Sequence, residues 1–204
     1  MRFLFPSNAD IWSQCPGSVG LIADLPDEPT TAAADEGTEA HKACECLLLQ
    51  GHCDDFPEPM KIAAKSYVEL IKSKLKDAAL RVEAKIPFLG MNARIDCYGK
   101  SEEDKMYCFD YKYGKTKVTA KTSMQQLFYA VAISVTEKVE EVFSYIHQPR
   151  IKEPVNSHSF SKFEIDNGLR TFERAIVRTN LVKGDHCKWC PAKRANICPK
   201  WRER

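Results

Sequence analysis

A change of hydrophobic period near residue 80 constrains the fold more than any other feature of this sequence. Residues 37–49 and 59–77 repeat apolar side chains at helical spacing, whereas residues 80–88 alternate them with polar ones, as a strand does. The two patterns continue along the chain and predict strands over 93–98, 106–113, 141–148 and 157–163, and helices over 123–135 and 166–182. This order predicts a mixed central β-sheet flanked by helices, a fold of the α/β or α+β class.

The length and the punctuation of the chain predict one domain. The 204 residues suit a single hydrophobic core, and no Gly/Ser-rich linker divides them. We divide this single domain, residues 1–204, into three segments. They are a mainly irregular N-terminal segment over 1–36, a core over 37–182 and a cysteine-rich basic tail over 183–204.

The apolar stretches of the chain are short. The stretch from Leu127 to Ile133 is far below the ~20 residues that a membrane helix needs, and the N-terminus lacks the apolar core of a secretory signal. We therefore expect a cytoplasmic protein with no membrane partner. In that reducing compartment, an odd number of cysteines, nine in all, is better explained by metal ligands and buried thiols than by disulfides.

Asp110 and Lys112 are two residues apart on a predicted strand, so their side chains point the same way. If this strand and the preceding one form a hairpin, Asp96 approaches Asp110, and Mg²⁺ or Mn²⁺ would hold the two carboxylates most naturally. Lys112 could then orient an attacking water or neutralise charge on a phosphate. An exposed Asp–Lys pair is the commoner explanation of an isolated D-x-K motif, so this motif alone is weak.

Two predicted helices carry side chains of matching chemistry. His41 and Glu45 are four residues apart and share one helix face, and imidazole is a good ligand for ions such as Mn²⁺. Gln125 and Tyr129 share a face of the later helix and suit hydrogen bonding to a phosphate. Ordinary polar helix faces remain the alternative for both pairs. Glu83 lies in a strand that alternates cleanly, so we expect it to face solvent.

Three cysteines of the tail, Cys187, Cys190 and Cys198, form a C-x2-C-x7-C motif. A C-x2-C turn places two thiolates on one metal or cluster with little strain. The fourth ligand has two candidates: Cys15 in the N-terminal segment, and His186, which would complete a zinc site. The other five cysteines fall mostly in helix or strand patterns and are best explained as small buried side chains.

Five short motifs in a fixed order resemble the RecB-like branch of the PD-(D/E)xK nuclease superfamily. They are GTEAHKACE at 37–45, VEAK at 82–85, RID at 94–96, DYKYGK at 110–115 and QQLFY at 125–129. The group that they resemble most comprises phage and prophage proteins similar to CRISPR-associated iron–sulfur exonucleases and to the AddB nuclease domain. The resemblance covers almost the whole chain and implies a restriction-endonuclease-like core followed by a C-terminal iron–sulfur segment.

The resemblance also implies roles for individual residues. The matching positions are His41, Asp96 and Asp110 as metal ligands, Lys112 as the catalytic lysine, and Gln125 and Tyr129 as the Q-x-x-x-Y motif that helps hold DNA near the metals. The match at Glu45 is looser. The family often has a glycine-rich stretch before the first of these aspartates, and this chain keeps only Gly90 there.

The resemblance favours Cys15 as the fourth cluster ligand. Related nucleases carry one cysteine before the nuclease core and three after it, and these four hold a [4Fe–4S] cluster. The corresponding cluster ligands here are Cys15, Cys187, Cys190 and Cys198. The C-x7-C spacing is longer than the C-x5-C of close relatives, so zinc remains the alternative.

The charge distribution agrees with DNA as the partner. Residues 183–204 hold seven Lys and Arg against two acids, and residues 111–136 contain four lysines and no acid, so both offer charge for phosphates. The aromatic side chains that could stack on unpaired bases are Trp189, Trp201, Tyr111 and Tyr113. Packing around the cluster explains the two tryptophans equally well.

We therefore expect a Mg²⁺- or Mn²⁺-dependent deoxyribonuclease, an exonuclease on single-stranded DNA or DNA ends, with a structural [4Fe–4S] cluster. The alternative is a catalytically weak DNA-end-binding or partner-docking module that keeps the fold and a cluster or zinc site. The presence of all four site residues, His41, Asp96, Asp110 and Lys112, favours the enzyme. The phage and prophage resemblance implies a bacterial host cell and a role in recombination or defence.

Overall fold

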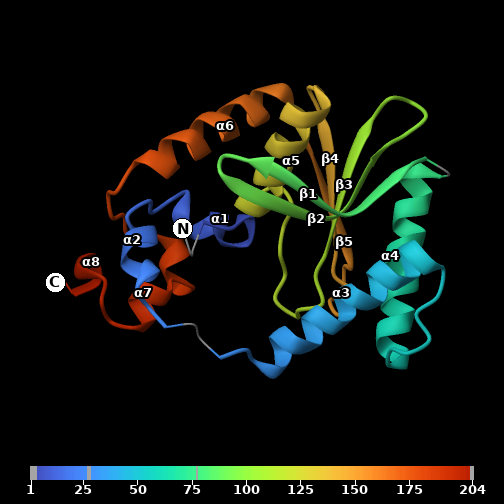
Figure 1. Ribbon diagram of the computed structural model, residues 1–204, viewed down its shortest axis with the longest axis horizontal. Coiled ribbons are helices and arrows are strands. Elements are labelled where there is room, and N and C mark those ends of the chain that lie inside the picture. Colours follow the sequence, from blue (N-terminus) through green and yellow to red (C-terminus); the bar gives the residue numbers. More distant parts are fainter. Residues whose placement is uncertain (1–3, 27–28, 77, 203–204) are drawn as a thin grey trace.

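The computed structural model describes residues 4–26, 29–76 and 78–202 (Figure 1). In chain order the elements are η1 (Pro6–Asn8), α1 (Ala9–Trp12), α2 (Ser18–Ala23), α3 (Ala32–Gln50), α4 (Glu58–Leu75), β1 (Leu80–Phe88), β2 (Met91–Lys100), β3 (Met106–Tyr111), α5 (Met124–Glu137), β4 (Val142–His147), β5 (Val155–Phe160), α6 (Lys162–Val177), η2 (Asp185–Lys188), α7 (Pro191–Arg194) and α8 (Pro199–Arg202). None of the helices in these ranges has the length and apolar character that a bilayer crossing requires.

A five-stranded sheet with the order β1-β2-β3-β4-β5 forms the centre of the described part of the chain. Neighbouring strands are antiparallel except β3 and β4, which are parallel and are joined by the crossover helix α5. Helices lie on both sides of the sheet (Figure 1). The predicted mixed sheet flanked by helices is therefore confirmed.

Each face of the sheet buries its own hydrophobic core. Helices α5 and α6 cover one core, which contains Phe128 and Phe172, and helices α3 and α4 cover the other, which contains Ile71 and Phe109. Strand β3 contributes to both, because successive side chains of a strand point to opposite faces. Cys108 joins the first core and Phe109 the second.

Strand β1 changes face at Glu83. Val82 packs against the core of α3 and α4, whereas Ala84 packs against the core of α5 and α6. In a regular strand these two residues would share a face. The cause is local: Glu83 has a φ of 49°, in the left-handed region, which breaks the alternation. The clean alternation expected over 80–88 is therefore wrong at this residue.

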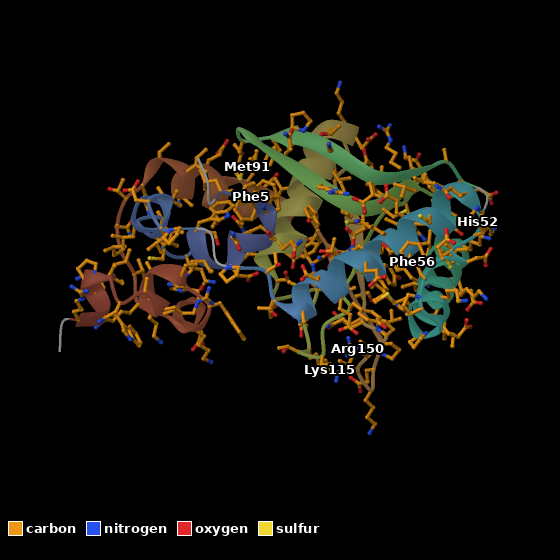
Figure 2. The ribbon with its side chains drawn as sticks, turned by 60° about the horizontal axis from the view of Figure 1, so that its bottom comes forward. Phe5, His52, Phe56, Met91, Lys115 and Arg150 are labelled. Carbon is orange, nitrogen blue, oxygen red and sulfur yellow. The ribbon has the colours of Figure 1, made fainter. Side chains whose placement is uncertain are left out.

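The N-terminal segment is more regular than its prolines indicate. The irregular chain expected over 1–36 is, in its described part, a series of short helices, η1, α1 and α2, and α3 already begins at Ala32. Trp12 at the end of α1 is fully buried against the rings of α5 and α6. Helix η1 contacts strand β2, and Figure 2 labels Phe5, the residue before η1, and Met91, the first residue of β2.

The two ends of the described chain pack together in one lobe, in which α2 lies against α7 (Figure 1). The amide of Gly17 donates a hydrogen bond of 3.0 Å to the carbonyl oxygen of Asn180. A Cβ at Gly17 would lie 2.3 Å from the carbonyl oxygen of Thr179, so only glycine allows this approach. Helix α6 ends at Val177, before the predicted end at residue 182, and extended chain leads from it into this lobe.

Candidate metal centre and catalytic cleft

An open cleft of about 570 Å³ lies between η1, the first half of α3 and the β1–β2 hairpin. Functional side chains from four elements line it: His41 of α3, Glu83 of β1, Asp96 of β2 and Tyr129 of α5. These elements are distant in sequence. The cleft therefore exists only in the folded chain.

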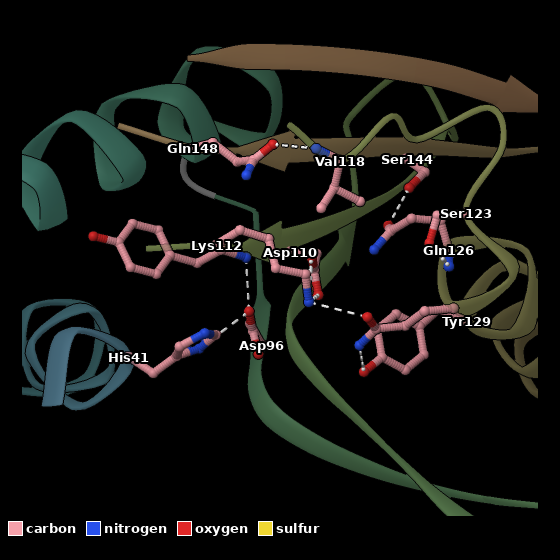
Figure 3. A network of polar contacts seen from close by, with 12 residues as sticks. His41, Asp96, Asp110, Lys112, Val118, Ser123, Gln126, Tyr129, Ser144 and Gln148 are labelled. Carbon is pink, nitrogen blue, oxygen red and sulfur yellow. Dashed lines mark hydrogen bonds and ion pairs between the residues drawn. The ribbon is translucent and has the colours of Figure 1, made fainter. Parts of the chain in front are cut away.

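The cleft lies where strands β2 and β3 separate. Their ladder of paired residues ends at Cys97 and Phe109, one residue short of Asp96. The side chain of Asp96 takes over the pairing, because its Oδ2 accepts a hydrogen bond of 2.7 Å from the backbone amide of Tyr111. This contact holds Asp96 close to Asp110 (Figure 3).

His41 and Asp96 form a charged pair at the wall of the cleft, with 3.4 Å between Nδ1 and Oδ2. Burial would raise the pKa of Asp96, but the hydrogen bond and charge of His41 outweigh it and lower this pKa. Burial would likewise lower the pKa of His41, but Asp96 raises it. The pair favours a carboxylate beside an imidazolium. A metal ion that binds both side chains would displace the imidazolium proton.

A chain of polar contacts leads inward from this pair (Figure 3). The ammonium of Lys112 lies 3.1 Å from Oδ1 and 3.0 Å from Oδ2 of Asp110, and it donates a hydrogen bond of 3.0 Å to Oε1 of Gln125. Nε2 of Gln125 in turn donates to the hydroxyl of Tyr129 at 2.7 Å. The structure therefore brings the predicted lysine, its acid and the Q-x-x-x-Y pair into one network.

Asp110 is the most deeply buried acid of this network, with 2% of its side chain exposed. Burial raises its pKa, the neighbouring charge of Asp96 adds to the rise, and Lys112 opposes both. Its Oδ2 lies 3.0 Å from the Lys112 ammonium, but no hydrogen bond to this oxygen is found in the described part of the chain, which leaves it a lone pair inside the protein. A carboxylate in this state is suited to accept a cation.

The structure adds Glu83 to the site. Ligand atoms of His41, Glu83 and Asp96 lie within 4.8 Å of one another, the one such group of metal-binding side chains among the described residues. Asp110 lies outside this group and pairs with Lys112. Burial raises the pKa of Glu83, with further upward contributions from nearby acids, whereas Arg94 lowers it. Only 15% of the Glu83 side chain is exposed, so the expected solvent-facing position is wrong.

Hairpin register was the signal that could have located Glu83. The residues on either side of Glu83 pair with those on either side of Asp96, so the two acids face each other across the strands. Directly opposed residues of an antiparallel pair share a face of the sheet. Counting outward from the turn at Leu89 and Gly90 would have placed them together, whereas alternation within β1 alone could not.

The four predicted cluster cysteines line one small pocket in the lobe of the chain ends, as does His186. They are Cys15, Cys187, Cys190 and Cys198. The amide of Val182 donates a hydrogen bond of 3.3 Å to Sγ of Cys15. Burial raises the pKa of the Cys15 thiol, and the nearby thiols add to the rise. His186 directs Nε2 to the carbonyl oxygen of Val182 at 3.0 Å, while its buried Nδ1 finds no hydrogen-bond partner among the residues that the structure describes.

The aromatic residues proposed to stack on bases divide into two groups. Tyr111 and Tyr113 are buried, with 0% and 7% exposure, so the expectation that they could stack on DNA is wrong. Trp189 is 65% exposed and Trp201 48% exposed. The ammonium of Lys193 lies 3.9 Å from the ring centre of Trp201, so that ring already carries a cation–π contact.

Removal of Lys112 should destabilise the metal-free protein, because the buried carboxylate of Asp110 would lose its counter-charge. We expect Lys112→Ala to lower the free energy of unfolding by about 2–3 kcal/mol in urea titrations with EDTA present. Asp110→Asn combined with Lys112→Ala should recover most of this loss, because an amide needs no counter-charge. Equal destabilisation of the single and double variants would contradict this account of the pair.

Comparisons with known proteins place the chain in a family. It is similar to the crystal structure of SSO0001, with 13% identity, a TM-score of 0.43, and coverage of 94% of this chain and 84% of that chain. It is also similar to an alkaline exonuclease (LHK-Exo) from Laribacter hongkongensis, with 10% identity, a TM-score of 0.32 and coverage of 92% and 98%. For the structure of LHK-Exo in complex with dAMP, the identity is 11% and the TM-score is 0.35. The match covers 94% of this chain and 98% of that chain. These likenesses are too distant to carry an argument about function. The family model described as "Protein of unknown function (DUF2800)" matches residues 2–66 and 50–204, so the chain belongs to that family.

Proposed function

We propose that this protein is a metal-dependent deoxyribonuclease that hydrolyses phosphodiester bonds in single-stranded DNA or at DNA ends. The observation that carries the proposal is the network at the wall of the cleft, in which the His41–Asp96 pair that lines the cleft lies beside the more deeply buried Asp110–Lys112 pair. The order of motifs that resembles RecB-like PD-(D/E)xK nucleases supports the same chemistry. The phage and prophage resemblance supports a bacterial host cytoplasm and a partner in recombination or defence.

The donor set suits Mn²⁺ or Mg²⁺. His41 offers an imidazole, and Asp96 and Asp110 offer carboxylate oxygens, which are the donors that these ions take in proteins. The free lone pair on Oδ2 of Asp110 and the open cleft beside His41 both fit an ion. A bound ion would supply Lewis-acid chemistry, since it lowers the pKa of an attacking water and shields the phosphate.

Lys112 is the residue best placed to act on the transition state. Its ammonium is held from two sides, by Asp110 and by Gln125, so its position costs no reorganisation during the reaction. The transition state of phosphodiester hydrolysis concentrates negative charge on the phosphate oxygens. A cation fixed beside the metal ligands therefore lowers the barrier more than it strengthens substrate binding. Tyr129, at the end of the chain of contacts, lines the cleft and could contact DNA.

We propose that Cys15, Cys187, Cys190 and Cys198 hold a [4Fe–4S] cluster. All four line the same pocket. Four thiolates are the usual ligand set of such a cluster. Because Cys15 and Cys187 are 172 residues apart, such a cluster would join the two ends of the fold.

The lobe of the chain ends offers a surface for single-stranded DNA. Trp189 is exposed beside a segment rich in Lys and Arg, and an exposed indole can stack on any unpaired base. Base stacking of this kind is sequence-tolerant, as a nuclease of DNA ends requires. Phosphate contacts from the basic tail would make the binding sensitive to salt.

The activity test compares Lys112→Ala with the wild type. We expect metal-dependent release of nucleotides from end-labelled single-stranded DNA by the wild type, and a loss on the order of 10²–10³ in rate for Lys112→Ala, because one preorganised cation is removed. DNA affinity should change little. Lys105→Ala, which removes an exposed lysine in the turn between β2 and β3, is the matched control and should retain near-normal cleavage.

Asp110→Ala separates the role of the metal from that of the lysine. It should be at least as inactive as Lys112→Ala, but excess Mn²⁺ should partly restore it and should not restore Lys112→Ala. Equal cleavage by wild type and Lys112→Ala would place the chemistry elsewhere. Tight DNA binding by the wild type without cleavage under any divalent metal would favour a DNA-end-binding module instead.

The cluster proposal predicts a brown protein with broad visible absorption after anaerobic purification. Cys15→Ser should lower the iron content and the thermal stability together, because the N-terminal segment would lose its link to the tail. Iron analysis and thermal unfolding measure both effects, and Cys46→Ser is a control outside the pocket. Stoichiometric zinc without iron would contradict the cluster. Unchanged cluster content in Cys15→Ser would make His186 the fourth ligand.

Trp189→Ala should weaken binding of single-stranded DNA by about 1–3 kcal/mol, the contribution of one stacked base. Fluorescence anisotropy with a labelled oligonucleotide measures this effect. Binding of blunt duplex should change less, because its bases are already stacked. An equal loss for both substrates would indicate that Trp189 supports the fold of the lobe, and thermal unfolding of the variant distinguishes the two.

A further inference from the structure

Glu83 has no role in the mechanism above, although its position is costly to maintain. It faces Asp96 across the β1–β2 hairpin, and like charges directly opposite each other destabilise a strand pair. Its backbone is held in the left-handed region, which is unfavourable for a residue with a long side chain. A site that keeps two opposed carboxylates needs positive charge between or beside them.

The positive charge nearest to Glu83 offsets only part of the repulsion between Glu83 and Asp96. Arg94 Nε contacts Oε2 of Glu83, and 63% of the Arg94 side chain is exposed, so solvent screens its charge. His41 pairs with Asp96. The contacts that the described residues make with the Glu83 carboxylate involve Oε2, and the residue lines the open cleft.

The three side chains have the arrangement of a metal site. Ligand atoms of His41, Glu83 and Asp96 lie within 4.8 Å of one another, and all three residues line the same open cleft, so an ion can reach them from solvent. One imidazole and two carboxylates are suited to Mn²⁺. Ligating carboxylates are commonly oriented by a second hydrogen bond, which Arg94 supplies to Glu83.

We propose that Glu83 is a direct ligand of a divalent cation that it binds together with His41 and Asp96, and that Arg94 is a positioning residue for Glu83. Asp96 then lies between two groups, His41 with Glu83 on the cleft side and Asp110 with Lys112 on the buried side. This inference rests on the proposed nuclease site, to which it adds a ligand from β1.

The test is an isothermal titration calorimetry experiment in which MnCl₂ is titrated into the metal-depleted protein. Glu83→Gln keeps the shape of the side chain and removes its charge, and we expect Mn²⁺ affinity to fall at least about tenfold. Glu83→Asp should retain part of the affinity. Glu102→Gln, which removes an exposed carboxylate far from the cleft, is the matched control and should bind as the wild type does.

Arg94→Gln tests the positioning role. It should weaken Mn²⁺ binding by less than Glu83→Gln does, and it should have no further effect in a protein that already carries Glu83→Gln. Thermal unfolding in EDTA verifies that each variant folds. If Glu83→Gln is unfolded, Glu83→Asp decides the question by its own affinity.

The outcomes separate this inference from the proposed function. If Glu83→Gln lowers the affinity for Mn²⁺ but the wild type cleaves no DNA, Glu83 is supported as a metal ligand and the proposed nuclease activity is overturned. If Glu83→Gln leaves the affinity for Mn²⁺ unchanged and the wild type cleaves DNA, the role of Glu83 as a ligand is overturned and the proposed nuclease activity stands. A wild type that binds no Mn²⁺ would overturn both.

Discussion

The hydrogen bond from the amide of Tyr111 to the carboxylate of Asp96 is the contact on which the rest of the site depends. It forms where the backbone pairing between β2 and β3 ends, so the side chain of Asp96 connects the two strands at a point where their backbones no longer do. The separation of the strands makes room for carboxylates between them. The separation leaves no backbone amide of Tyr111 unpaired, because Asp96 accepts its hydrogen bond, and so the cost of a buried unpaired amide is avoided.

The lobe of the chain ends is connected to this site through the first helices. Trp12 packs its ring against Phe128 and Phe172, and Cys15 follows three residues later in the cysteine pocket. Phe128 belongs to the same helix as Gln125, which holds the ammonium of Lys112. Buried side chains therefore connect the cysteine pocket to the polar network of Lys112 and Gln125.

The residues of β3 alternate between two environments, one on each face of the sheet. Phe109 and Tyr111 face the core of α3 and α4, while Cys108 faces the other core and Asp110 meets Lys112 and α5. One strand thus builds an apolar layer with Phe109 and Tyr111 and presents the acid of the proposed site, Asp110, between them. This alternation is why Tyr111 is buried although it lies between Asp110 and Lys112.

The sequence by itself determined the order of the four long helices and the five strands of the core, and the shared facing of Asp110 and Lys112. Both follow from local periodicity, which each segment carries in its own residues. Only the tertiary structure decided that Glu83 joins Asp96 and that the cysteine pocket gathers both chain ends. It also decided that Tyr113 is buried. These facts depend on hairpin register, on a single left-handed residue and on packing between distant segments, and none of these leaves a signal within one segment.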